Sequence, residues 1–148
     1  MNVEEIIKTN HQMPLEKRTL IHLALVVNKI DEEIAMVLKP FDISIQQFNV
    51  LRILRGQNGK PANLSTINER MVTKMSNTTR LVDKLILKGF ANRNVCLKNR
   101  RKVEIVITEE GLNILNKIDG ILFEAEKRIL KNFDGTELQQ LNELLNKF

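Results

Sequence analysis

The chain has 148 residues, of which 43% are hydrophobic and 28% charged, and its net charge is +5. This composition suggests one folded domain over residues 1–148 and excludes disordered and fibrous proteins. The longest apolar runs, such as residues 23–27, are too short to cross a membrane.

The first two predicted helices cover residues 15–38 and the stretch from Ser44 to about Arg55. Apolar residues recur at steps of three or four in the first, and Pro40 ends it. Ser44 and Gln47 have the spacing of a capping box at the start of the second. The apolar residues of the first helix are Leu20, Leu23, Val27, Ile30, Ile34 and Leu38.

Two shorter helices are predicted next. Asn63 is placed to cap the first of them, and the second is expected from about Met75 to Lys88. Gly89 then fits the left-handed position that commonly follows a helix. Two short helices joined by a turn of three or four residues form a helix-turn-helix unit.

Residues 91–97 and 102–107 are predicted to form a hairpin, because apolar and polar side chains alternate in the second segment. Thr108 is placed to cap a helix that runs to about Asn132. A last helix follows, and Asp134 and Glu137 have the spacing of a capping box at its start. Its apolar stripe consists of Leu138, Leu141, Leu145 and Phe148. We therefore expect a mainly α fold with a small β-hairpin wing.

Positive charge is concentrated in the middle of the chain. Residues 60–102 contain eleven Lys and Arg but two acids, a net charge of +9, whereas residues 1–59 are neutral and residues 103–148 carry −4. Such a local excess is typical of a surface that binds a polyanion. A basic surface without a partner would have the same charge.

The candidate DNA-binding residues lie at the start of the second short helix and at the hairpin tip. An α-helix fits the major groove, where its first polar residues reach base edges, and a basic hairpin can follow the adjacent backbone or minor groove. The candidates are Thr73, Lys74, Ser76, Asn77, Thr78, Arg80, Lys84, Lys98, Asn99, Arg100 and Arg101.

Several candidates also have a purely structural interpretation. Lys84 can be an ordinary solvated position, Thr78 a packing residue, and Arg100 and Arg101 can simply keep an exposed hairpin soluble. Three hypotheses therefore stay open: a sequence-specific DNA-binding regulator, a non-specific or architectural nucleic-acid-binding protein, and a dimeric ligand-binding or interaction module without DNA recognition.

Residues 60–111 resemble the core of the MarR (multiple antibiotic resistance regulator) family. The matching segments are Thr-Arg-Leu-Val-Asp-Lys-Leu at residues 79–85, Gly89-Phe90, and Ile-Thr-Glu-Glu-Gly at residues 107–111. With the flanking helices, the resemblance covers nearly the whole chain. It implies a winged helix-turn-helix with N- and C-terminal dimerisation helices.

The resemblance also implies the organisation of a repressor. The winged helix-turn-helix would cover about residues 44–108, and the helices in about residues 1–40 and 109–148 would intertwine in a homodimer. The helix from Met75 would enter the major groove of a palindromic double-stranded operator, and the wing at residues 99–101 would meet the minor groove or backbone. A small-molecule effector or an oxidant would relieve repression.

Two places depart from the family pattern. Asn99 stands where the family usually has an Asp two residues before Arg101, and an amide cannot form the ion pair that steadies this arginine. Val72 and Lys74 replace a glycine and a hydroxyl residue in the turn. Thr73 is therefore the candidate to cap the recognition helix instead.

No catalytic, cofactor or metal motif is evident, so we expect no enzyme activity and no cofactor. His11 and His22 are too isolated to suggest a metal site. Cys96 is expected to be a buried residue of the first wing strand, with a reactive thiol near Arg93 and Lys98 as the alternative. One cysteine and the acidic first residues, which do not resemble a secretory signal, predict a cytoplasmic protein.

Overall fold

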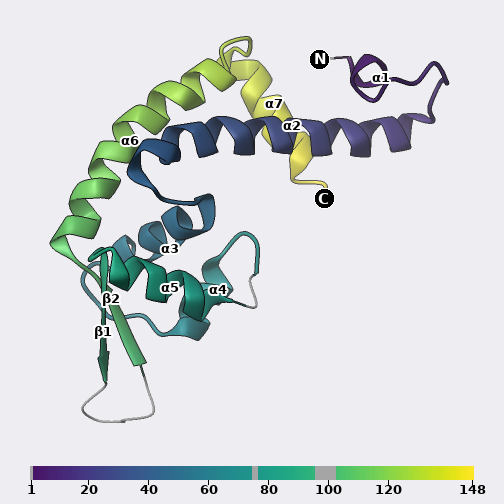
Figure 1. The fold of residues 1–148 in the computed structure, drawn as a ribbon. Helices are drawn as coiled ribbons and strands as arrows, with labels where there is room; N and C mark the ends of the chain where they lie inside the picture. The colour runs from purple at the N-terminus through teal and green to yellow at the C-terminus, as the bar shows by residue number, and fades with distance from the viewer. Residues whose placement is uncertain (1, 75–76, 96–102) are drawn as a thin grey trace.

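The structure is a computed structural model that describes residues 2–74, 77–95 and 103–148. It is mainly helical with one two-stranded antiparallel sheet, which confirms the predicted fold class (Figure 1). In chain order the elements are α1 (Val3–Ile6), α2 (Leu15–Leu38), η1 (Lys39–Phe41), α3 (Ile45–Arg55), α4 (Leu64–Arg70), α5 (Thr78–Leu87), β1 (Ala91–Val95), β2 (Val103–Ile107), α6 (Glu109–Ile129) and α7 (Gly135–Leu145).

Figure 1 shows two parts of different shape. The winged unit, made of α3, α4, α5, β1 and β2, forms the lower part. The long-helix layer, made of α2, α6 and α7, extends above it, and α2 packs against α6. Two connections join the parts, η1 between α2 and α3, and Thr108 between β2 and α6.

The helix starts that depend on local capping agree with the predictions. Ser44 Oγ accepts from the Gln47 N–H at 3.2 Å, and Gln47 Oε1 accepts from the Ser44 N–H at 3.0 Å, so the capping box is complete. Asp134 and Glu137 form a second one at α7. Thr108 Oγ1 accepts from the Gly111 N–H at 3.0 Å and caps α6.

Two helix boundaries differ from the predictions, and one helix was not predicted. Helix α5 begins at Thr78 and not near Met75, and α6 ends at Ile129 and not near Asn132. The short helix α1 was not predicted, because four residues carry too little periodicity. It is held by tertiary contacts: Val3 is fully buried, and Arg18 of α2 donates to the Glu4 carboxylate at 2.7 Å.

The hairpin pairs Ala91 with Ile107 at one end and Val95 with Val103 at the other. A further bridge, which the sequence did not predict, joins Ala62 to Ile105 on the outer side of β2. Its two backbone hydrogen bonds measure 2.9 Å and 2.8 Å. The segment before α4 is therefore fixed to the wing.

The core runs through the winged unit and continues along α6. Its largest fully buried side chains come from α2, α3, α4, α5, β2 and α6, so all these elements share it. Gly111 is required where α6 passes the wing, since a Cβ there would lie 2.2 Å from the Phe90 carbonyl oxygen. The fully buried side chains include Leu38, Leu51, Ile67, Leu85, Ile105, Leu115 and Ile118.

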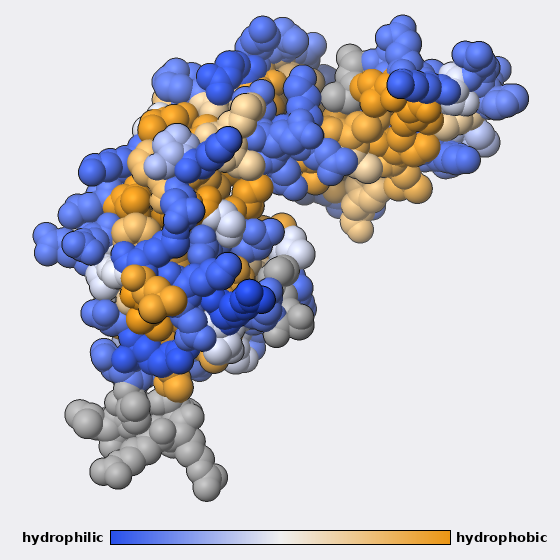
Figure 2. Space-filling view, viewed as in Figure 1, coloured by the Kyte–Doolittle hydropathy of each residue, from blue (hydrophilic) through white to orange (hydrophobic). Residues whose placement is uncertain are grey.

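The long-helix layer leaves many large apolar side chains uncovered. Orange patches of hydrophobic residues mark part of this surface in Figure 2. Within α7, all of whose residues are described, none is buried, although its apolar residues keep a helical spacing. The exposed side chains of the layer and the segments beside it include Leu15, Leu20, Val27, Met36, Ile121, Phe123, Phe133, Leu144, Leu145 and Phe148.

Candidate nucleic-acid interface

The helices α4 and α5 form the helix-turn-helix unit. Val82 and Leu85 of α5 are fully buried, and Ile67 of α4 is buried with them in the core. The opposite face of α5 is exposed and carries Arg80 and Lys84. This amphipathic division presents one polar face of α5 to the solvent.

Arg80 and Lys84 are not neutralised within the described part of the chain. Neither forms an ion pair among residues 2–74, 77–95 and 103–148. Of the two acids in the basic segment, Asp83 pairs with Arg93, and Glu69 lies on α4, where it accepts from the Ser65 hydroxyl. The exposed face of α5 is therefore positive.

The start of α5 differs from the predicted capping arrangement. Asn77 occupies the N-cap position, is exposed, and makes no side-chain capping hydrogen bond. Thr73 lies four residues earlier and is not the cap, so that prediction was wrong because the helix begins later than expected. Thr73 and Lys74 are both exposed, while Ser76 lies outside the described residues.

Thr78 has a structural role. Its side chain is 6% exposed, and its hydroxyl donates to Asn68 Oδ1 of α4 at 3.1 Å. This bond joins the two helices of the helix-turn-helix unit at the first residue of α5. Of the two interpretations of Thr78, the packing one is favoured by this geometry.

The wing is tied to α5 by an ion pair that the sequence did not indicate. Arg93 of β1 donates to the Asp83 carboxylate of α5 at 2.6 Å. The predicted contacts of the hairpin tip, Lys98, Asn99, Arg100 and Arg101, lie outside the described residues, as does Cys96. Their roles stay predictions.

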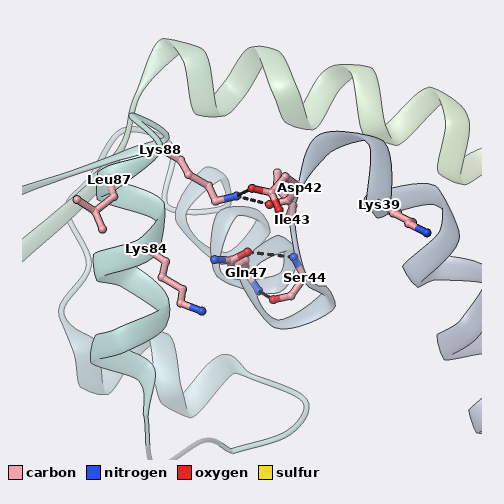
Figure 3. A pocket seen from close by; sticks show the side chains of 8 residues that line it. All are labelled: Lys39, Asp42, Ile43, Ser44, Gln47, Lys84, Leu87 and Lys88. Carbon is pink, nitrogen blue, oxygen red and sulfur yellow. Dashed lines mark hydrogen bonds and ion pairs between the residues drawn. The ribbon is translucent and has the colours of Figure 1, made fainter.

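The C-terminal end of α5 is held by another side chain. Lys88, the C-cap residue, donates from Nζ to the backbone oxygen of Asp42 and, at 2.5 Å, to its carboxylate (Figure 3). The hydrogen bond and charge of Lys88 lower the pKa of Asp42 below its ordinary value. No sequence signal predicted this pair, because 46 residues separate its members.

A shallow cavity of about 530 Å³ surrounds this ion pair, between the start of α3 and the end of α5. The buried Gln47 uses its carboxamide oxygen in the capping box, and its nitrogen points toward α5 (Figure 3). The lining residues are Lys39, Asp42, Ile43, Ser44, Gln47, Lys84, Leu87 and Lys88.

Metal-binding clusters and membrane-spanning helices are both absent from the described residues. No group of three or more His, Cys, Asp and Glu among them is arranged to hold a metal ion. None of the described helices combines the length and apolar composition that crossing a membrane requires. The candidate functional site is the exposed, positive face of α5 in the helix-turn-helix unit.

The sequence is similar to a known family and to known transcriptional regulators. The MarR family model matches residues 43–103. The HTH-type transcriptional regulator PecS of Dickeya dadantii is 31% identical, over 80% of this chain and 72% of PecS. The HTH-type transcriptional repressor IacR of Pseudomonas putida is 26% identical, over 83% of this chain and 72% of IacR.

Solved structures of MarR proteins share this fold. The apo form of wild-type MarR from E. coli matches with a TM-score of 0.72 and 27% identity. The match covers 93% of this chain and 98% of the E. coli chain, so it includes the flanking helices as well as the winged unit.

Proposed function

Because the chain belongs to the MarR family of transcriptional regulators, we propose that it is a sequence-specific repressor that binds DNA as a homodimer and is released by a small ligand. Members of this family are regulators and not enzymes. The relative IacR is named a repressor, which supports the proposed sign of regulation. The proposed location is the cytoplasm, where a bacterial regulator meets DNA.

The observation that carries the proposal is the exposed, positive face of α5 in a helix-turn-helix unit. We assign this helix to the major groove, with Asn77 and the preceding turn reaching base edges. Arg80 and Lys84 then meet phosphates or guanine edges along the helix. Thr73, Lys74 and Ser76 from the turn, and the wing tip at residues 98–101, complete the proposed contact surface.

The uncovered apolar side chains support the homodimer. Leu20 is 62% exposed and Leu144 57% exposed, and they lie on helices that flank the winged unit. Apolar patches of this kind mark association surfaces, and a second copy supplies the same patch by two-fold symmetry. The proposed dimerisation helices are accordingly α2, α6 and α7.

A titration of fluorescent DNA with the purified protein tests the proposal. The DNA flanking the protein's own gene is compared with shuffled DNA of equal length at physiological salt, by polarisation. We expect tight binding to the first and a specificity ratio of about 10³ or more. Equal affinity for both would favour an architectural nucleic-acid-binding protein, and no binding by an intact dimer would favour a module without DNA recognition.

Arg80→Ala should weaken operator binding. Loss of a phosphate contact would lower affinity for all sequences and reduce the slope of log K against log salt by about one. Loss of a base contact would instead cost about 1–3 kcal/mol at one base pair. The matched control is Lys117→Ala, which removes an exposed cation from a different helix, α6. Unchanged affinity in Arg80→Ala would remove α5 as the recognition helix.

A further inference from the structure

Among the described residues, side-chain contacts join α5 to α4, to β1 and to the turn at Asp42. Thr78 bonds to α4, Asp83 pairs with β1, and Lys88 reaches Asp42. The first two ties are internal to the winged unit. The third is made to the segment that leaves the long-helix layer, because Asp42 directly follows η1 at the end of α2.

The geometry of this third tie is specific. Asp42 is in the left-handed conformation, with φ of 52°, and Lys88 contacts both its backbone oxygen and its carboxylate. The turn itself is fixed on both sides, by Pro40 before it and by the Ser44 capping box after it. Lys88 thus binds a turn that local interactions hold on both sides.

We propose that Lys88 and Asp42 are positioning residues that set the half-site spacing accepted by the dimer. This inference rests on the proposed function. In a two-fold dimer, the distance between the two recognition helices depends on how each winged unit sits on its dimerisation helices. The tie joins the end of α5 to the corner through which α2 enters that unit, so it restricts rotation of α5 about this corner.

The competing role for Lys88 is a direct phosphate contact. Figure 3 shows its ammonium group directed at Asp42, on the side of α3, with the stem crossing the cavity from α5. The Lys88 side chain is 25% exposed and that of Asp42 is 96% exposed. The two roles predict opposite effects of removing the carboxylate, and this difference makes them separable.

The first experiment uses Lys88→Met, which keeps the apolar stem, and Asp42→Asn, which keeps a residue tolerant of the left-handed conformation. An operator is selected with the wild-type protein from random DNA, and its half-site separation is then lengthened and shortened by one base pair. In both variants, the ratio of the affinity for the selected spacing to that for an altered spacing should fall about threefold. This is the effect expected from the loss of one exposed ion pair. Lys88→Arg should keep most of it, and Lys117→Met is the control.

A different pattern would overturn the inference. If Asp42→Asn tightens binding at every spacing while Lys88→Met weakens it at every spacing, Lys88 is a phosphate ligand. If both variants keep the wild-type spacing preference, the tie does not position α5.

A second measurement does not need DNA. Spin labels are attached at the exposed position 79 of each protomer, through Thr79→Cys in a Cys96→Ser background, and their separation is measured in the free dimer. The distance distribution should broaden in Lys88→Met and Asp42→Asn; an unchanged distribution would overturn the inference. If the wild-type protein selects no operator, the proposed function fails, and this distribution still decides whether the tie positions α5.

Discussion

At the scale of single residues, Thr78 and Arg80 have different surroundings, although both lie in the first turn of α5. The Thr78 hydroxyl is buried and bonds to Asn68, so it holds α4 and α5 together. Arg80, two residues later, is exposed and points its charge to the solvent. Burial therefore distinguishes Thr78, which packs between two helices, from Arg80, which lies on the proposed DNA-binding surface.

Thr78→Val should lower the free energy of unfolding by about 1 kcal/mol, because it removes a part-buried hydrogen bond while keeping the side-chain volume. Urea unfolding followed by circular dichroism measures this loss. Thr78→Ser keeps the hydroxyl and is the control for the bond. If Thr78→Val is as stable as the wild type but loses operator specificity, Thr78 reads bases directly.

At the scale of helices and strands, a helix start was predictable where its cap depends on nearby side chains. The starts of α3, α6 and α7 depend on side chains within three residues of the cap, so the sequence contained the full signal. The short helix α1 also has a local cap, since the Asn2 side chain accepts from the Glu4 N–H, but its four residues carry too little periodicity to be predicted. Val3 burial and the ion pair with α2 hold it as well. The first residue of α5, Thr78, bonds to Asn68 of α4. The local sequence does not indicate this tertiary contact.

The two glycines of α6 should respond in opposite ways to alanine. At Gly111 a methyl group meets the Phe90 carbonyl, so Gly111→Ala should destabilise the fold by about 1–3 kcal/mol. At Gly120 nothing lies within 4 Å of the added atom, so Gly120→Ala should stabilise α6 by about 0.5–1 kcal/mol. Chemical denaturation of both variants checks the pair, and equal effects would contradict the close approach of α6 to the wing.

The attachment of α1 to α2 should depend on pH. The hydrogen bond from Arg18 lowers the pKa of Glu4, so its stabilising contribution is present above the pKa of a free glutamate and is lost as the pH falls through the folded value. Acidification through the lowered pKa of Glu4, below the ordinary range of a glutamate, should therefore release α1. The methyl NMR signals of the buried Val3 report this release directly.

Two variants make the pH result specific. Glu4→Gln should show the released Val3 signals already at neutral pH, and Glu5→Gln, an exposed neighbour in α1, should behave like the wild type. Identical Val3 signals in Glu4→Gln and wild type at neutral pH would mean that apolar contact alone holds α1.

At the scale of the whole molecule, the winged unit and the flanking helices differ in how far their apolar side chains are buried. The winged unit has a buried core, whereas α7 has no buried residue of its own. The periodic apolar residues of the flanking helices predicted such helices but not which side of each stays uncovered. That distinction depends on the packing of α2 against α6.

Leu144→Glu should convert the dimer into monomers. It places a charge on a side chain that is 57% exposed in the single chain but buried in the proposed dimer, where an unpaired carboxylate is costly. Light scattering at micromolar concentration measures the mass. Gln140→Glu, an exposed change in the same helix, is the control. A wild-type protein of monomeric mass would refute the dimer itself.

The sequence predicted the positive charge of the candidate site and the helix that carries it, but not the ion pairs that hold this helix in place. Arg80 and Lys84 were identified because cations gather in one segment and the helical period puts them on one face. The pairs of Lys88 with Asp42 and of Arg93 with Asp83 depend on where separate elements meet. Such contacts follow from tertiary structure, to which no local sequence pattern corresponds.

The bridge between Ala62 and Ile105 has a consequence for the behaviour of the protein at high concentration. β2 is flanked by β1 on one side and by Ala62 on the other. A strand edge with unpaired N–H and C=O groups recruits strands from neighbouring chains, and covering it prevents this. By occupying the backbone groups of Ile105, the segment before α4 protects the base of the wing against strand exchange and aggregation.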